Sequence, residues 1–368
     1  MQKKLIALAI ASAISAPAFA DNANFSFYGA ADVSYDSVNT GDGTTTANGA
    51  TAVTGMSKRV VSSNVSKFGF KGSEDLGDDL AAVWQIEQQI NLDDAAKNTF
   101  ASRNTFAGLK GSFGTVLMGI HDTPYKLTTR KLDVFGDSIA DNRALLGGVS
   151  STSAAAAFDG RQSNVLAYIS PSMSGVTAAI ATVNLKEANK LSTDKSGSAL
   201  SVGVMFDAAP FYGAVGYEKH SLDYVASGAN ETATKLGFGF SDDMFSVGAV
   251  YEKTSDNLGA AQENQYGHNA VYLSGMLKMG NSAAKLAYGK AGVLGTGAAQ
   301  VADSGATMVA VGYDHGLSKR TKLYALYSKI SNGKGINYAF TQSSGASSTN
   351  SGFGTSPSVI SLGMKHTF

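Results

Sequence analysis

The sequence predicts an all-β fold, a transmembrane antiparallel β-barrel of about 16 strands whose third long loop folds inward. Apolar and polar side chains alternate with a period of two residues along most of the chain after residue 20. Short and long connections alternate between the strand-like segments. No run of about 18 apolar residues follows residue 20, so the sequence offers no membrane-spanning helix.

The first 20 residues have the pattern of a secretory signal peptide. Lys3 and Lys4 form a basic start, residues 5–14 form an apolar stretch, and residues 18–20 (Ala-Phe-Ala) form a small-x-small cleavage site. The alternative is a true N-terminal helix. We expect cleavage after residue 20, which leaves residues 21–368 as one exported barrel domain.

Charge and cysteine content exclude several classes of protein. The formal charge is zero, with 29 basic and 29 acidic residues, and loss of Lys3 and Lys4 leaves 27 against 29, a net charge of −2. This balance does not favour nucleic acid as a partner. The chain has no cysteine, which excludes disulfides and cysteine-based metal sites. We expect no metal and no cofactor.

Sixteen segments after residue 21 have the alternation of a strand. In the clearest of them, Phe245, Val247 and Tyr251 share one face, and Ser246 and Glu252 lie on the other. The predicted strands are 25–35, 58–72, 80–91, 102–111, 113–121, 161–170, 175–186, 197–207, 211–220, 232–241, 244–254, 267–279, 282–291, 305–315, 321–331 and 357–368.

The connections fall into two groups that alternate along the chain. The short ones are 73–79, 112, 171–174, 208–210, 242–243, 281 and 316–320. The long ones are 36–57, 92–101, 122–160, 187–196, 221–231, 255–266, 292–304 and 332–356. All long connections then lie at one end of the sheet, which is typical of bacterial outer-membrane barrels. Their Gly, Ser, Thr and Asn content would also suit disordered linkers, but the strand pattern continues on both sides of each.

The alternation also predicts which medium each face contacts. Lipid offers the backbone no hydrogen-bond partners, so a chain without long apolar helices can span it only as a closed barrel. In the hairpin around residues 66–87 we expect the apolar set to face acyl chains and the polar set to face a wet interior. The apolar set is Phe68, Phe70, Trp84 and Ile86, and the polar set is Lys67, Lys71, Gln85 and Glu87.

A barrel of this size has a lumen wider than side chains can fill. The loop 122–160 is the longest connection and contains the charge-rich stretch HDTPYKLTTRKLDVFGDSIADNRALLGG. We predict that it folds into the lumen as a lid or plug that sets the pore size. The alternative is a loop that stays outside the barrel.

Several stretches resemble the trimeric general-diffusion porins of Gram-negative outer membranes. FYGAADVSY resembles their first strand, SKFGFKGSEDLGDDLAAVWQIE the second hairpin, RNTFAGLKGSFGTVLMG the next hairpin, and residues 361–368 the last strand. The resemblance implies a homotrimer in the outer membrane, in contact with its lipid and lipopolysaccharide, that lets small hydrophilic solutes and ions diffuse passively. It also implies that the terminal Phe368 is a signal for the barrel-assembly machinery.

The same resemblance implies a pore constriction. Family members have basic residues on the wall that face acidic groups on the inward loop, and Lys67, Arg103 and Arg161 match the wall positions, with lysine for arginine at 67. The loop stretch LDVFGD matches the family's Phe-Gly turn, with Asp-Val in place of Pro-Glu. The loop residues implied at the constriction are Asp133, Asp137 and Asp141 as acids, and Arg130, Lys131 and Arg143 as bases.

Other functions have weaker support in the sequence. None of the five histidines lies in a local catalytic motif, and neither HExxH nor a Gly-x-Ser-x-Gly turn between strand and helix occurs. We expect no enzyme and no catalytic residues. A substrate-specific or anion-selective channel is the alternative to a general porin.

Overall fold

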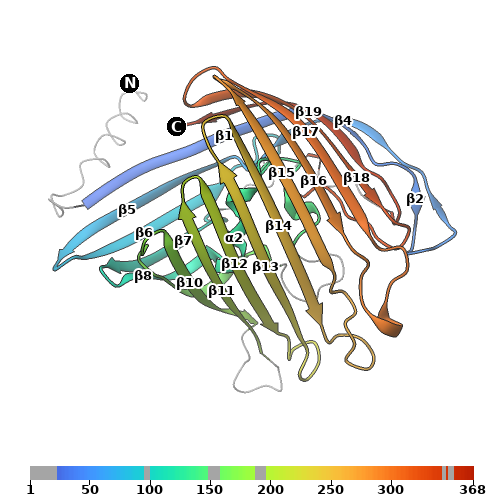
Figure 1. Ribbon diagram of the computed structural model, residues 1–368, viewed down its shortest axis with the longest axis horizontal. Coiled ribbons are helices and arrows are strands. Elements are labelled where there is room, and N and C mark those ends of the chain that lie inside the picture. The colour runs from blue at the N-terminus through green and yellow to red at the C-terminus, as the bar shows by residue number, and fades with distance from the viewer. Residues whose placement is uncertain (1–22, 95–99, 148–157, 187–195, 342–344, 347–351) are drawn as a thin grey trace, which may run out of the picture.

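Sixteen antiparallel strands form a closed wall around a lumen in the computed structural model (Figure 1). The structure describes residues 23–94, 100–147, 158–186, 196–341, 345–346 and 352–368. The predicted signal peptide therefore lies outside the described residues. No helix in the described part is long and apolar enough to cross a membrane.

The wall strands follow one another in chain order. They are β1 (Ala23–Asn39), β4 (Ser57–Ser63) with β5 (Lys67–Gly77), β6 (Leu80–Gln89), β7 (Thr105–Gly111), β8 (Gly114–Asp122), β9 (Arg161–Ile169), β10 (Val176–Lys186), β11 (Gly197–Ala208), β12 (Phe211–Ser221), β13 (Asn230–Ser241), β14 (Phe245–Asp256), β15 (Asn269–Met279), β16 (Ser282–Ala291), β17 (Ala306–Gly316), β18 (Thr321–Asn332) and β19 (Ser358–Thr367). The connections hold β2 (Gly43–Thr44), β3 (Ala52–Val53), the helix α2 (Pro124–Thr129) and the 3-10 turns η2 (Arg130–Leu132), η3 (Asn142–Ala144) and η4 (Gly297–Ala299).

The first strand closes the barrel. One edge of β1 pairs with β19, from Ala30 opposite Thr367 to Asn39 opposite Ser358. The other edge of β1 pairs with β4 and β5. The wall therefore has no free edge, as a sheet in lipid requires. The predicted all-β barrel of 16 strands is confirmed when β4 and β5 are counted as one strand.

The predicted strand 58–72 is interrupted in its middle. Asn64 N–H donates to the carbonyl of Asp32 at 2.8 Å, and the Ser66 hydroxyl both accepts from Asp32 N–H and donates to Asp32 C=O, each at 2.9 Å. Val65 between them has φ 54°. Hydroxyl and amide groups thus replace ladder bonds and divide the strand into β4 and β5, as at a β-bulge.

The predicted turn 73–79 is shorter than expected. Ser73 and Glu74 pair with both β1 and β6, so β5 continues to Gly77. Only Asp78 and Asp79 form the turn, with φ 51° and 59°. Two left-handed residues in succession match the tight hairpin that the twist of paired strands favours. The polar residues before the turn are paired strand residues at the rim of the barrel.

The predicted faces of this hairpin are confirmed. Phe27 lies opposite Phe70 in the register with ring centroids 5.2 Å apart, and Phe27 is 50% exposed on the outside. Tyr28, the next residue, points inward and donates its hydroxyl to Glu87 at 3.0 Å. The outer wall is therefore apolar and the inner wall polar.

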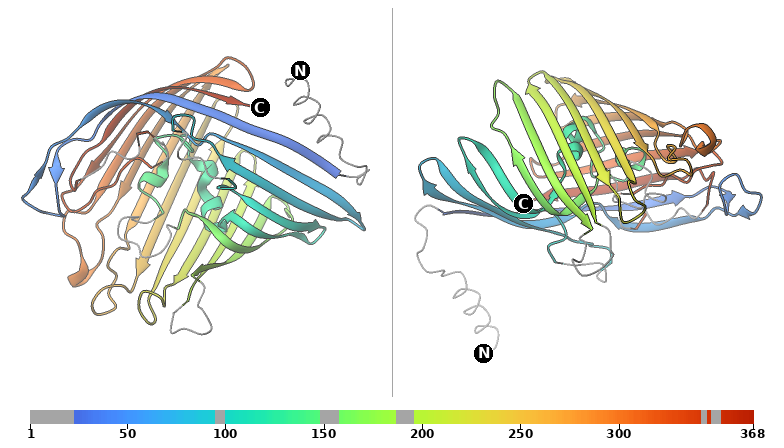
Figure 2. Two further views of the ribbon diagram at one scale, coloured as in Figure 1. Left: turned by 180° about the vertical axis from the view of Figure 1, so that it is seen from behind. Right: turned by 90° about the horizontal axis from the view of Figure 1, so that it is seen from below.

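The third long loop, residues 122–160, is here called loop 3, and its described parts, residues 122–147 and 158–160, lie inside the barrel. Figure 2 shows α2 surrounded by the strands in both views. Tyr125, Phe135 and Leu145 of this loop are among the most buried large side chains described. The prediction of an inward-folded loop is confirmed.

Candidate pore constriction

Side chains of the wall hold the first half of loop 3. The Tyr212 hydroxyl donates to the carbonyl of Thr128 at 2.7 Å, and the Ser274 hydroxyl donates to the carbonyl of Leu132 at 2.6 Å. Tyr125 donates its hydroxyl to Glu252 at 2.6 Å. These bonds satisfy buried polar groups of the loop and tie it to β12, β14 and β15.

Inward-facing glycines make room for the loop along the same wall. A Cβ at Gly203 would lie 3.0 Å from the carbonyl oxygen of Pro124, and a Cβ at Gly248 would lie 2.5 Å from the carbonyl oxygen of Leu132. A Cβ at Gly312 would lie 2.8 Å from the ring of Phe135. Glycine at these positions lets the loop backbone approach the sheet closely. The described part of the loop therefore lies against the wall from β11 to β17.

Asp133 fixes the fold of the loop. Its carboxylate accepts from the N–H groups of Phe135 at 2.8 Å and Asn142 at 2.9 Å and from the Tyr272 hydroxyl at 2.5 Å. The side chain is buried and does not face open water. Lys131 points to the wall and pairs with Asp207 on β11. Neither residue forms an ion pair with the other described charges of the loop.

Four loop residues form a network of ion pairs. Arg130 contacts Asp137 at 3.2 Å and Asp141 at 3.1 Å, and Arg143 contacts the same two carboxylates at 3.0 and 2.8 Å. Asp137 has φ 61°, which turns the chain just after the Phe-Gly pair. Although burial opposes the effect, hydrogen bonds from Arg143 and the charge of Arg130 lower the pKa of Asp141. Both carboxylates are therefore ionised at neutral pH.

The predicted wall cations gather around two carboxylates. Glu87 contacts Arg103 at 2.5 Å and Lys67 at 3.4 Å. Asp122 contacts Arg161 at 3.2 Å and the loop residue Lys126 at 2.7 Å.

The pKa of Asp137 links the cations around Glu87 to the loop. Although burial opposes the effect, Arg130 holds the pKa of Asp137 below its ordinary value. Arg103, which the structure places in the connection two residues before β7 and not in the predicted strand 102–111, adds to the same lowering, so its charge reaches the loop.

The structure adds three residues to those inferred from the sequence. Glu87 was placed on the wet face by the alternation but was not among the constriction residues that the resemblance implied. Asp122 and Lys126 are spaced i, i+4 at the start of the loop, a spacing at which opposite charges can meet on a helix. The charges do not separate into a basic wall and an acidic loop, because both sides carry mixed ion pairs.

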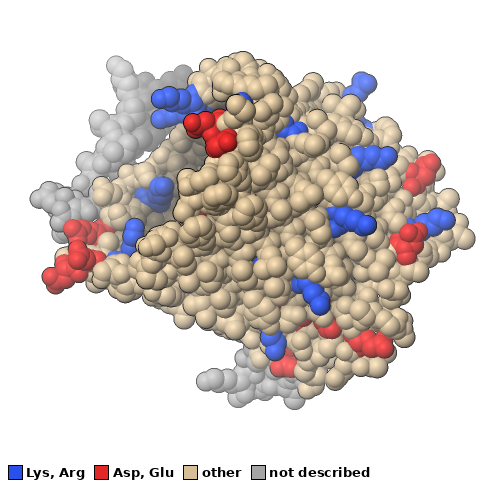
Figure 3. All heavy atoms as spheres, viewed as in Figure 1, with Lys and Arg blue, Asp and Glu red and all other residues tan. Residues whose placement is uncertain are grey.

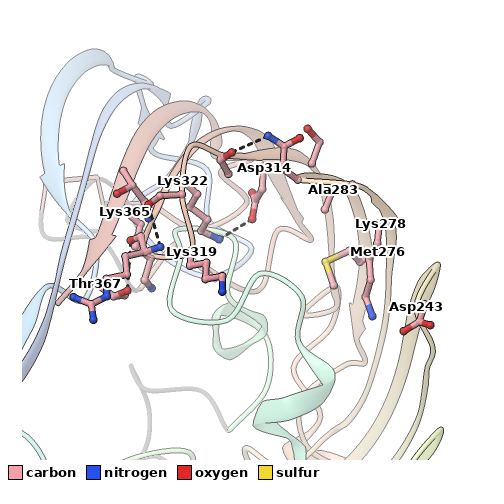
Figure 4. Close-up of a pocket in the computed structure, with 16 residues that line it drawn as sticks. Asp243, Met276, Lys278, Ala283, Asp314, Lys319, Lys322, Lys365 and Thr367 are labelled. Atoms are coloured by element: carbon pink, nitrogen blue, oxygen red, sulfur yellow. Dashed lines mark hydrogen bonds and ion pairs between the residues drawn. The ribbon is translucent and has the colours of Figure 1, made fainter.

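A second basic cluster lies at the short-turn mouth of the lumen. A pocket of about 670 Å³ is lined there by Lys278 of β15, Lys322 of β18, Lys365 of β19 and the turn residues Lys319 and Arg320. Figure 4 shows Lys319, Lys322 and Lys365 on one side of Asp314 and Lys278 on the other. Lys322 contacts Asp314 at 2.6 Å, whereas Lys319 and Arg320 form no ion pair with a residue that the structure describes.

No group of three or more metal-ligating side chains occurs among the described residues. The arrangement instead offers fixed charges around water, which can order and select ions without binding a cofactor.

Acidification should tighten the docking of loop 3. Burial raises the pKa of Asp133 to about 6, and the charge of Asp141 adds to the rise. Such a group stabilises the docked loop fully below its ordinary pKa of 3.8 and loses this contribution as the pH rises through about 6. From pH 7 to pH 5 the opening equilibrium of the loop should fall about tenfold. Amide hydrogen exchange of residues 124–147, corrected for intrinsic rates, measures it.

Two variants test the source of this pH dependence. Asp133→Asn should make loop opening independent of pH between 5 and 7. Asp243→Asn, in an exposed turn, should leave the wild-type dependence in place. Wild-type opening that increases on acidification would show that another group controls the loop.

A closed wall with an apolar outside, a polar lumen and an inserted loop defines a channel-forming membrane barrel. The chain belongs to the family of Gram-negative porins, whose model matches residues 7–335. It is therefore an outer-membrane porin, and the predicted channel for passive diffusion and its location are confirmed. The family indicates a channel rather than an enzyme.

Relatives and solved structures agree with this assignment. The chain is 27% identical to the major outer membrane protein P.IB of Neisseria lactamica over 343 residues, which cover 91% of this chain and 95% of the relative. The anion-selective porin from Comamonas acidovorans has a TM-score of 0.75 at 21% identity and covers 94% of this chain and 100% of its own. A trimer form of OmpT, an outer membrane protein of Vibrio cholerae, has a TM-score of 0.65 at 14% identity, with coverages of 95% and 100%. At these identities the two structures support the fold alone.

Proposed function

We propose that this porin conducts small hydrophilic solutes and ions through the constriction between loop 3 and the wall, with a preference for anions. The charge count around the constriction carries the proposal. In these ion-pair groups six cations face four carboxylates, and ionised Asp133 would still leave one cation in excess. The cations are Lys67, Arg103, Lys126, Arg130, Arg143 and Arg161, and the carboxylates are Glu87, Asp122, Asp137 and Asp141. The buried Lys235 with Asp159 and Glu252 forms a separate group that is not counted.

The short-turn mouth supports the same preference. An anion that leaves the constriction meets the basic cluster around Lys319, Arg320 and Lys322. Clusters of one charge sign along a wet pore raise the local concentration of the opposite ion and bias selectivity. Salt screens this bias over about 8–10 Å near physiological ionic strength.

The reversal potential in a KCl gradient across a planar bilayer tests the proposal. Wild-type channels should give the sign of an anion preference. The double variant Lys67→Gln/Arg103→Gln should shift it toward cations, by up to about fivefold in permeability ratio for each charge, because a unit charge a few ångströms away contributes about 1 kcal/mol in water.

Two controls accompany this measurement. Glu87→Gln removes a negative charge from the same cluster and should shift the reversal potential toward a stronger anion preference. Lys219→Gln removes a cation from the outer face of β12 and should leave it unchanged. A potential that is the same in wild type and the double variant would remove Lys67 and Arg103 from the conduction path.

The assembly around the channel also belongs to this proposal. We infer a homotrimer, because Phe25 and Phe27 are 64% and 50% exposed and stack with Phe70 and Trp84 on one outward patch, and because a trimer form is recorded for the Vibrio protein. Such a patch suits an interface within the membrane. Folded protein that sediments as a single chain would contradict the trimer.

We further infer that the signal peptide is cleaved after residue 20 and that the barrel-assembly machinery recognises Phe368.

A further inference from the structure

Four exposed lysines form a row on the outer face of the barrel. Each is the last residue of a Tyr-x-Lys triplet that occurs four times in the sequence. The lysine is the ninth residue of its strand in every case. The triplets are Tyr217–Lys219 on β12, Tyr251–Lys253 on β14, Tyr288–Lys290 on β16 and Tyr327–Lys329 on β18.

The triplets face outward. The four tyrosines are between 39% and 42% exposed, and the four lysines are exposed as well. The residue between them is buried in each triplet and points to the lumen. Outward aromatic residues near strand ends form the girdles that lie at the membrane interface of such barrels. The lysines therefore lie one step beyond the girdle, toward the long loops.

The strand register places the four lysines at about the same depth in the membrane. Lys219 lies opposite Thr232 of β13, and Thr232 lies opposite Ser255 of β14. Ser255 is two residues beyond Lys253 along β14. The same offset of two residues separates Lys290 from Lys329. Two residues along a strand span about 6.8 Å and two strands span about 9.6 Å, a slope of about 35° that matches the strand tilt of membrane barrels. Neighbouring lysines are then about 12 Å apart.

These lysines are free to bind an external partner. None of the four forms an ion pair with a residue in the part of the chain that the structure describes. Figure 3 shows basic side chains spaced across this face, with much of the surface around them uncharged. An outward cation is costly at the bilayer centre and inexpensive at the interface, so the position suits contact with lipid headgroups.

We propose that this lysine row binds the phosphate groups of lipopolysaccharide in the outer leaflet. The long loops mark the extracellular end of the barrel, so the row faces the headgroups of that leaflet. Each ammonium is a point charge with three donors that suits phosphate oxygens, and the tyrosine below it packs at the border of the acyl region. The proposal rests on the outer-membrane location and names the surface that lipid would occupy.

Lipopolysaccharide binding to the purified, folded protein tests the proposal. The quadruple variant with glutamine at positions 219, 253, 290 and 329 should lose affinity at least tenfold, since each lysine near an anionic surface contributes about fivefold. Lipopolysaccharide with its phosphates removed should bind the wild type as weakly as intact lipopolysaccharide binds the quadruple variant. Four arginines at these positions should restore binding.

A matched pair separates the row from general charge. Lys253→Gln/Lys290→Gln should weaken binding, whereas Lys278→Gln/Lys319→Gln, the same charge change at the short-turn mouth, should not. Equal affinity of wild type and quadruple variant, or equal binding of dephosphorylated lipid, would overturn the proposal. Bilayer conductance of the quadruple variant should equal that of the wild type, because these side chains point away from the lumen, so the channel function is tested separately.

Discussion

Replacing Gly248 with alanine should release loop 3 from the wall and increase the single-channel conductance. The added Cβ would lie 2.5 Å from the carbonyl oxygen of Leu132, a backbone atom that also accepts the 2.6 Å hydrogen bond of Ser274. The loop has to move, and its anchor on β15 is lost with the movement. Overpacking of this kind costs about 1–3 kcal/mol, which shifts the docking equilibrium about 5- to 150-fold.

The measurement is the distribution of single-channel conductance in planar bilayers. Gly275→Ala on the adjacent strand is the matched control, because its Cβ would meet nothing closer than the Ser246 carbonyl oxygen at 3.9 Å. That variant should conduct as the wild type does. If Gly248→Ala also gave the wild-type distribution, loop 3 would not set the size of the pore.

The wall of the barrel was predictable because it depends on a local pattern. Each residue such as Phe245 or Glu252 faces lipid or the inside of the barrel according to its parity, and parity is visible in one chain. The break at Val65 was not predictable in this way, since it depends on Asn64 and Ser66 meeting Asp32 on another strand. Alternation contains no information about such cross-strand exchange of hydrogen bonds.

The constriction was less predictable than the wall. The resemblance offered Arg103 and Lys67 as candidates, and the alternation placed Glu87 on the inner face. The position of each loop charge depends on how loop 3 packs, and that packing depends on tertiary contacts such as Tyr272 with Asp133. The sequence therefore supplied candidates, and only the structure separates the buried Asp133 from the partly exposed Asp137.

Inward-facing glycines connect the strand pattern of the wall with the position of loop 3. Gly248 and Gly312 lie inward in strands, where a side chain would normally be expected, and each has a loop residue against its Cα hydrogens. Gly in a strand interior weakens the strand but allows close backbone approach. Inward glycines on β11 to β17 thus mark the docking side of the loop.

Deletion of Phe368 should reduce assembly of the barrel about tenfold. The residue closes the seam between the ends of the wall: Gly29 N–H donates to Phe368 C=O at 2.9 Å, and Phe368 N–H donates to Gly29 C=O at 3.1 Å. Its ring lies 5.6 Å from that of Phe27. Two lost hydrogen bonds contribute about 1–3 kcal/mol, and the aromatic ring is lost with them.

The role of Phe368 in the seam can be separated from recognition by the assembly machinery. Phe368→Ala keeps the backbone pair and removes the ring, whereas Gly29→Val keeps the ring but blocks its seat, since a Cβ at residue 29 would collide with it. The yield of refolding into detergent should fall most for Gly29→Val, because this substitution displaces both the seam hydrogen bonds and the ring of Phe368. Assembly in cells should suffer most from Phe368→Ala and the deletion if the machinery reads the terminal ring. Equal loss in both assays for every variant would mean that Phe368 acts through the seam alone.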